Sequence, residues 1–173
     1  VKTNFVNKKL RFTNNINKAI RNSKIIFIAV GTPHKKNGEA DLSYVYAATN
    51  SIADNLNNYK IICTKSTVPV GTGHEIEKII LSKNDAKLFD YISNPEFLRE
   101  GSAINDFMRP DRVVIGTENI KSTNIMRELY RPLYLLETPI VSTSIESSEI
   151  IKYASNSFLA TKIGFINQVA DLC

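Results

Sequence analysis

Residues 24–33 read Lys-Ile-Ile-Phe-Ile-Ala-Val-Gly-Thr-Pro, and this stretch decides the fold class. Its apolar run is short and rich in isoleucine and valine, which is typical of a strand buried on both faces of a parallel sheet. Glycine and proline then predict a loop. Loops of this kind lie at the carboxyl edge of an open α/β sheet, where ligands bind. We therefore expect a ligand site near Thr32.

Apolar runs alternate with helical patterns along the rest of the chain. Further strands are predicted at 59–64, 87–92 and 112–116, and helices at 42–57, 72–81 and 119–130. This order predicts an α/β fold with a mostly parallel sheet. The loop Lys-Ser-Thr-Val-Pro-Val-Gly at 65–71 would lie at the same sheet edge as Thr32.

A long helix is predicted from Ser144, or from Thr143, to the last residue, Cys173. Its side chains are apolar nearly all round, which indicates a helix buried between domains or subunits. We divide the chain accordingly into residues 1–142 and residues 143–173. Lys152 and Asn156 interrupt the apolar pattern at helical spacing. A lysine there can snorkel to solvent, but the neighbouring asparagine favours a pair that faces a ligand.

Residues 94–101 read Asn-Pro-Glu-Phe-Leu-Arg-Glu-Gly and place two carboxylates four residues apart. With Asn94 as N-cap and Pro95 as the first helical residue, Glu96 and Glu100 would share one helix face. Like charges at that spacing repel each other, so we expect a site that needs a carboxylate. The alternative is a solvated helix start, where the helix dipole favours glutamate.

The composition limits the class of protein. At 173 residues and 43% hydrophobic content, one globular domain is expected. No apolar run is long enough to cross a bilayer and the chain does not begin like a signal peptide, so we expect no membrane partner and a cytoplasmic location. Two cysteines and two histidines predict no metal site. The net charge of +5 is spread along the chain without a basic stripe, so no nucleic-acid partner is expected.

The Gly-x-Gly-x-x-Gly turn that opens a dinucleotide-binding domain does not occur in this sequence. Its only Gly-x-Gly, at residues 71–73, follows a loop and is interpreted as an ordinary helix entry. The elements therefore suggest the second half of a Rossmann-like NAD-binding domain, followed by the long helix. We expect the chain to be a fragment.

Several motifs, taken together, resemble the nucleotide-sugar 6-dehydrogenases, which form the UDP-glucose/GDP-mannose dehydrogenase family. The resemblance runs from about Ile25 to Cys173. It rests on five blocks in the family's order, at residues 30–33, 65–72, 94–101, 109–116 and 152–160. The segment from Glu100 to Arg112 looks more like the UDP-glucose branch than the GDP-mannose branch.

The resemblance implies an NAD-dependent enzyme that oxidises C6 of UDP-glucose twice, through a cysteine thioester, to give UDP-glucuronate. It implies a homodimer formed through the long helix. Thr32, Thr67 and Glu100 would contact NAD. Thr67 would also hold the water that hydrolyses the thioester.

The resemblance also assigns catalytic and substrate residues. Glu96 would handle protons or activate the water, Lys152 would stabilise a developing oxyanion, and Asn156 would orient the same oxygen or the sugar. The residues implied to line the sugar nucleotide are Glu96, Phe97, Leu98, Arg99, Glu100, Lys152 and Asn156.

One expected segment is missing from this chain. The family's nucleophilic cysteine lies in a Gly-rich segment after the long helix, and neither Cys63 nor Cys173 matches that motif. We therefore expect no turnover by this polypeptide alone. Two alternatives stay open: a GDP-mannose or UDP-N-acetyl-sugar dehydrogenase, and a non-catalytic nucleotide-binding or dimerisation module.

Overall fold

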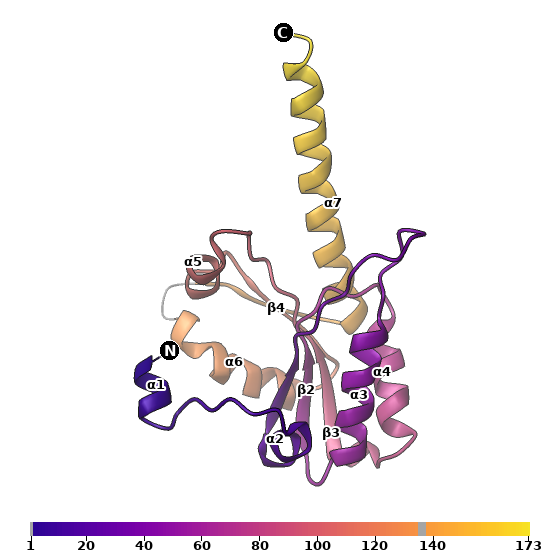
Figure 1. Ribbon diagram of the computed structural model, residues 1–173, viewed down its shortest axis with the longest axis vertical. Coiled ribbons are helices and arrows are strands. Elements are labelled where there is room, and N and C mark those ends of the chain that lie inside the picture. The colour runs from indigo at the N-terminus through magenta and orange to yellow at the C-terminus, as the bar shows by residue number, and fades with distance from the viewer. Residues whose placement is uncertain (1, 135–137) are drawn as a thin grey trace.

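A five-stranded sheet forms the centre of the computed structural model, which describes residues 2–134 and 138–173 (Figure 1). β1 to β5 lie side by side in chain order. β1, β2 and β3 are parallel, as are β4 and β5, whereas β3 and β4 are antiparallel and pair only through Ser93 and Gly116. The mostly parallel α/β sheet predicted from the sequence is confirmed. The strand bounds are Ile25–Ile28, Lys60–Thr64, Phe89–Ser93, Val113–Gly116 and Ile140–Thr143.

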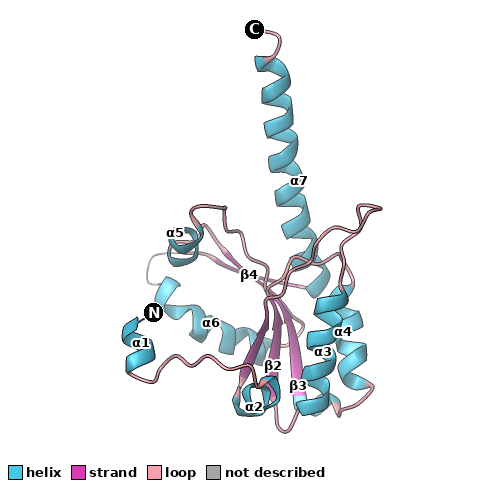
Figure 2. Cartoon of the chain, viewed as in Figure 1, coloured by secondary structure: helices cyan, strands magenta, loops and turns pink. Residues whose placement is uncertain are grey.

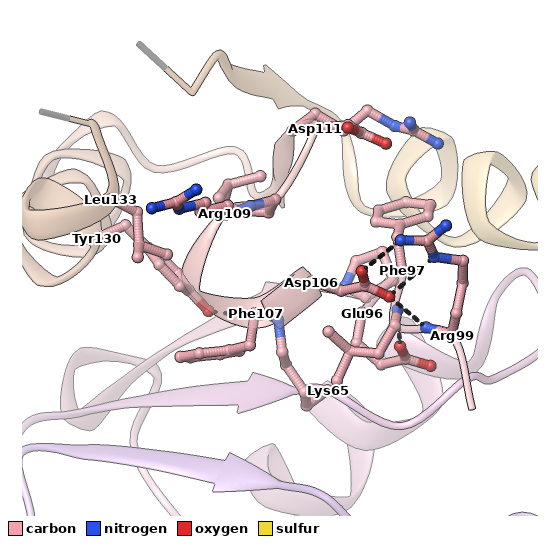
Figure 3. Close-up of a pocket in the computed structure, with 15 residues that line it drawn as sticks. Lys65, Glu96, Phe97, Arg99, Asp106, Phe107, Arg109, Asp111, Tyr130 and Leu133 are labelled. Atoms are coloured by element: carbon pink, nitrogen blue, oxygen red, sulfur yellow. Dashed lines mark hydrogen bonds and ion pairs between the residues drawn. The ribbon is translucent and has the colours of Figure 1, made fainter. Parts of the chain in front are cut away.

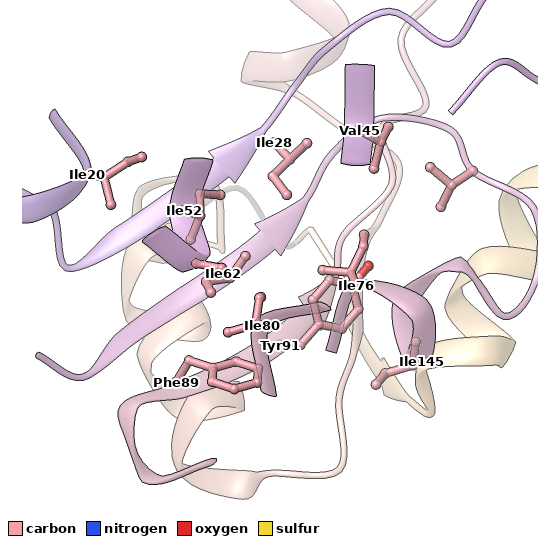
Figure 4. Packing of buried hydrophobic residues seen from close by; sticks show 12 residues of the cluster. Ile20, Ile28, Val45, Ile52, Ile62, Ile76, Ile80, Phe89, Tyr91 and Ile145 are labelled. Carbon is pink, nitrogen blue, oxygen red and sulfur yellow. The ribbon is translucent and has the colours of Figure 1, made fainter. Parts of the chain in front are cut away.

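Helices cover both faces of the sheet (Figure 2). On one face, Val45 of α3 and Ile76 of α4 pack with Ile62 of β2 in a buried cluster (Figure 4). On the other face, Met126 of α6 packs against Ile61. Every residue of β2 is buried because successive side chains of a strand point to opposite faces and both faces are covered. The helices are α2 (Ile16–Asn22), α3 (Ser43–Asn55), α4 (Thr72–Leu81) and α6 (Ile120–Tyr134).

The segment after β3 differs from the prediction. Residues 94–99 form a loop without regular secondary structure, residues 100–102 form a turn, and the next helix, α5, spans Ala103–Met108. Asn94 does not cap a helix, because its backbone N–H donates to Thr64 and its side-chain amide to the carbonyl of Val114. The prediction that Glu96 and Glu100 share a helix face is therefore wrong.

Smaller differences concern the ends of elements. α3 begins at Ser43, and the Asp41 carboxylate accepts a hydrogen bond from the Ser43 backbone N–H. A 3-10 turn, η1 (Ala86–Leu88), precedes β3. The short helix α1 (Lys2–Val6) and α2 were not predicted.

The long helix α7 spans Ile145–Ala170 and ends just before the predicted limit. Ser144 is its N-cap, as predicted, with its hydroxyl accepting from the Ser147 backbone N–H. The helix extends away from the sheet, and apolar side chains of its outer part are exposed, including Phe158 at 67% and Phe165 at 63% (Figure 1). Within the described residues, no helix has the length and apolar character needed to cross a membrane.

The first turns of α7 lie directly against the sheet and α4. The Glu149 carboxylate accepts from the backbone N–H groups of Gly71 and Gly73, at 2.7 and 2.8 Å. These donors are at the N-terminus of α4, where no intrahelical acceptor is available. A Cβ on Gly73 would lie 2.5 Å from Cγ2 of Ile145, so only glycine permits this approach.

A second contact between α4 and α7 involves His74. Its Nδ1 lies 3.0 Å from a carboxylate oxygen of Glu77, and its Nε2 contacts the carboxylate of Glu146. The hydrogen bonds to Glu146 and then to Glu77 raise the pKa of His74 above 6.5. The same hydrogen bond lowers the pKa of Glu146 to about 2.

Replacing Gly73 with alanine should destabilise the chain by about 1–3 kcal/mol, because the new methyl group overlaps Ile145 and Tyr91. Gly164, on the outer part of α7, has no atom within 4 Å of an added Cβ. Gly164→Ala should stabilise the chain by about 1 kcal/mol through helix propensity. Urea unfolding of both variants measures the two changes. A Gly73→Ala chain as stable as wild type would contradict the close docking of α7.

The His74 contacts predict a loss of stability as pH rises. A raised folded-state pKa gives stabilisation that is fully present below the unfolded value of 6.5 and lost as pH rises through the raised value. His74→Gln should remove this dependence in that window. Urea unfolding across a pH series tests it, with His34→Gln, in an exposed loop, as the matched control. Parallel curves for wild type and His74→Gln would show that the contact has no such effect.

Candidate functional site

A pocket of about 280 Å³ lies beside the carboxyl ends of β2 and β3 (Figure 3). Its wall is formed by Lys65 after β2, by residues 95–99 after β3, by the segment from α5 to β4, and by Tyr130 and Leu133 of α6. Because the carboxyl edge of the sheet was predicted to hold a ligand, this is the first candidate for the site.

An ion pair joins the loop at residues 94–99 to the long helix α7. Nζ of Lys152 lies 3.1 Å from Oε1 of Glu96, although the two residues are 56 positions apart in the chain. The Lys152 side chain is 6% exposed and that of Glu96 is 29% exposed. The other Glu96 oxygen accepts from the backbone N–H of Leu98. Lys152 therefore does not snorkel to solvent, and its charge is held beside a carboxylate at the pocket.

The Phe97 ring lies next to two cations. The guanidinium carbon of Arg112 is 4.2 Å from the ring centre, and Nζ of Lys152 is 5.4 Å from it. Arg112 also donates to the Ser155 hydroxyl on α7, at 3.1 Å. Cation–π attraction and this hydrogen bond hold the loop at residues 94–99 against the first turns of α7.

A second group of predicted residues lies at the ends of β1 and β2. The Thr32 hydroxyl donates to the backbone carbonyl of Thr67, at 3.0 Å, and Ser66 donates to the carbonyl of Val30, at 2.7 Å. An added Cβ on Gly31 would meet no atom within 4 Å, so the edge there is open. Thr32 and Thr67 are not among the residues that line the pocket.

The remaining predicted residues are distributed between the pocket and the surface. Phe97, Leu98 and Arg99 line the pocket, where Arg99 pairs with Asp106 at 2.7 Å and holds the pKa of that carboxyl well below its usual range. Glu100 is exposed in the turn after this segment. Asn156 is exposed one helical turn beyond Lys152. The structure thus brings Lys152 into contact with Glu96 of the pocket wall, whereas Asn156 does not join them.

Three charged residues near the site had no role assigned from the sequence: Lys65, Arg112 and Glu149. Lys65 and Arg112 belong to quoted motifs, and each lies next to an apolar strand, which is the only local signal they carry. Glu149 was hidden within the first turns of a mostly apolar helix. Their partners come from other elements, so spacing along the chain could not reveal them.

Neither cysteine is a nucleophile of this pocket. Cys63 is fully buried in β2, and burial raises the pKa of its thiol to about 12, so it stays protonated at neutral pH. Cys173 is exposed at the far end of α7. Among the described residues, no group of three or more His, Cys, Asp or Glu side chains could hold a metal ion.

Comparison with known proteins gives matches over both parts of the chain. Residues 1–134 match the model described as "UDP-glucose/GDP-mannose dehydrogenase family, NAD binding domain", and residues 146–173 match the central domain of the same family. The whole chain is 53% identical to UDP-glucose 6-dehydrogenase of Rhizobium meliloti (strain 1021) and spans 40% of its length.

Solved structures agree with these matches. A UDP-glucose dehydrogenase from the archaeon Pyrobaculum islandicum has a TM-score of 0.89 and 36% identity, over 95% of this chain and 38% of that one. A GDP-mannose dehydrogenase from Pseudomonas aeruginosa, solved as a ternary complex, has a TM-score of 0.87 and 33% identity, over 96% of this chain and 39% of that one.

Proposed function

Since the chain belongs to the UDP-glucose/GDP-mannose dehydrogenase family, we propose that it forms part of an NAD-dependent enzyme that oxidises UDP-glucose to UDP-glucuronate. The observation that carries this proposal is the contact between Lys152 and Glu96, which joins a cation of the long helix to a carboxylate that lines the pocket at the sheet edge. The 53% identity to a UDP-glucose 6-dehydrogenase favours UDP-glucose as the sugar nucleotide.

The cofactor would lie at the open edge formed by the loops after β1 and β2. Thr32 and Thr67 tie these loops together, and the space beside Gly31 is free of other atoms, which fits a bound NAD. Glu100, exposed in its turn, would contact it from the side of the pocket. When bound, NAD would take up the electrons released by each oxidation at C6. No Gly-x-Gly-x-x-Gly turn occurs in residues 1–173, so this chain would make only part of the contacts.

Lys152 and Glu96 would divide the charge chemistry between them. Negative charge develops on the C6 oxygen as it loses its proton, and the ammonium of Lys152 would stabilise that oxygen by about 3 kcal/mol. Glu96 would accept protons and activate the water that releases the product. Thr67 would help to hold this water, and Asn156 would orient the reacting oxygen or the sugar.

The substrate would lie along the loop at residues 94–99, which follows β3. Phe97, Leu98 and Arg99 line the same pocket as Glu96 and would line the sugar nucleotide with it. The proposed thioester needs a cysteine thiolate. Because Cys63 is buried and Cys173 is remote, this nucleophile would come from another segment of the longer enzyme.

We also propose that two copies of the protein associate through α7. The exposed apolar side chains on its outer part would be covered in such a homodimer. A reducing, cytoplasmic location would suit the free thiol of Cys63.

The enzyme expressed from the complete reading frame should form NADH and UDP-glucuronate from UDP-glucose, and much less NADH from GDP-mannose. NADH absorbance and product chromatography measure both. Residues 1–173 alone should form none, because no suitable cysteine is present. A complete enzyme that is inactive on UDP-glucose, or faster on GDP-mannose, would overturn the proposed substrate.

Substitutions in the complete enzyme should separate the two roles. Lys152→Ala should lower kcat by about 10²–10³-fold with a smaller change in KM, because the lost contact acts on charge that develops in the transition state. Glu96→Gln should let the covalent thioester accumulate, which mass spectrometry detects. Lys78→Ala, on the exposed side of α4, is the control. If Glu96→Gln accumulates no adduct, Glu96 is not the base that activates water.

A further inference from the structure

Lys65 is a half-buried cation in the pocket wall, and no carboxylate among residues 2–134 and 138–173 forms an ion pair with it. The carboxylates that form ion pairs within these residues are paired with lysine, arginine or histidine side chains other than Lys65. The ammonium of Lys65 instead donates to two neutral oxygens, Oδ1 of Asn94 at 3.2 Å and the hydroxyl of Tyr130 at 3.3 Å. Removing an ammonium from water without a counter-ion is unfavourable.

The hydrogen bonds around Lys65 have defined directions. The amide nitrogen of Asn94 donates to the carbonyl of Val114, at 2.7 Å, so its Oδ1 faces Lys65. Tyr130 donates its single proton to the same Oδ1, at 2.6 Å, and its own oxygen can then only accept from Lys65. Asn94 is fully buried and Tyr130 is 7% exposed. Two acceptors therefore hold the ammonium in place, and its third N–H is left for another partner.

The carboxylates that line the pocket with Lys65 are those of Glu96, Asp106 and Asp111, and Asp106 is paired with Arg99. Burial is the main cause that lowers the pKa of Lys65, and the neighbouring Lys152 lowers it further, against the opposing effect of Glu96. The Glu96 carboxylate is already hydrogen-bonded to Lys152 and to the Leu98 backbone. In Figure 3 the Lys65 side chain rises from the sheet edge between Tyr130 and Glu96. An anion entering the pocket would meet the ammonium of Lys65, which forms no ion pair with a carboxylate of the described residues.

We propose that Lys65 is a binding residue for an anionic oxygen of the molecule that occupies this pocket. The inference rests on the proposed function, in which that molecule is a sugar nucleotide. Such a ligand has two sources of anionic oxygen: its diphosphate, and the carboxylate that oxidation creates at C6. Lys65 differs from Lys152 because no carboxylate of the described part of the chain pairs with its charge, so it contributes to affinity before any charge develops on the sugar.

NMR of residues 1–173 with ¹³C-labelled lysine tests this inference without turnover. The signal of Lys65 is the one that disappears in the Lys65→Arg variant. UDP, UDP-glucose and UDP-glucuronate are the probes. If the diphosphate is bound, all three ligands should shift the Lys65 signal saturably and raise its pKa. If the carboxylate is bound, only UDP-glucuronate should do so. If none of the three ligands shifts the Lys65 signal, the proposal is overturned. Lys65 would then serve only to connect the end of β2 to α6 through its hydrogen bond to Tyr130.

Affinity gives a second readout. Lys65→Met should weaken the binding of each ligand that shifts the Lys65 signal by about tenfold or more, since a charge-assisted hydrogen bond is lost. Lys78→Met, which removes an exposed lysine of α4, should not. Far-ultraviolet circular dichroism shows whether Lys65→Met stays folded, and equal affinity of the folded variant would refute the inference. Neither readout uses NAD, so binding through Lys65 can persist even if the complete enzyme fails to oxidise UDP-glucose.

Discussion

The docking of the first turns of α7 against the carboxyl edge of the sheet is the constraint on which the rest of this structure depends. One carboxylate, that of Glu149, satisfies two backbone donors at the start of α4. Gly73 of α4 has no side chain, and this leaves room for Ile145 of α7 and for Tyr91 of β3 beside it. Without this docking, Lys152 would extend into solvent with the outer part of α7, and Glu96 would lose its partner.

The charges around the pocket are arranged to be only partly compensated. Glu96 is matched by Lys152, whereas Lys65 is held by neutral oxygens and Arg112 by an aromatic ring. A ring and an amide neutralise a cation far less than a carboxylate does, so the pocket keeps positive character. Such a surface is complementary to a substrate that carries a diphosphate. The chain belongs to the UDP-glucose/GDP-mannose dehydrogenase family, and both sugar nucleotides in that name carry a diphosphate.

The two halves of α7 have different environments. Its first turns bury Ile145, Ser148 and Lys152 against the sheet, while Phe158 and Phe165 are more than half exposed farther along. One continuous helix therefore links Lys152, which contacts the pocket wall, to an exposed apolar surface. Because a helix is stiff over this length, a contact at the outer half would also restrain the position of Lys152.

The sequence by itself determined the layered α/β fold, because short apolar runs such as residues 25–30 alternate with helical patterns and are typical of strands covered on both faces. It also marked Lys152 as a candidate site residue, because Asn156 interrupts the same apolar helix beside it. The conformation after Asn94 was decided by tertiary structure, since the side chain that could have capped a helix bonds to Val114 instead. The surroundings of Lys65 were decided the same way. Its acceptors come from Asn94, which directly follows β3, and from Tyr130 of α6, and only the folded chain brings these groups within hydrogen-bonding distance.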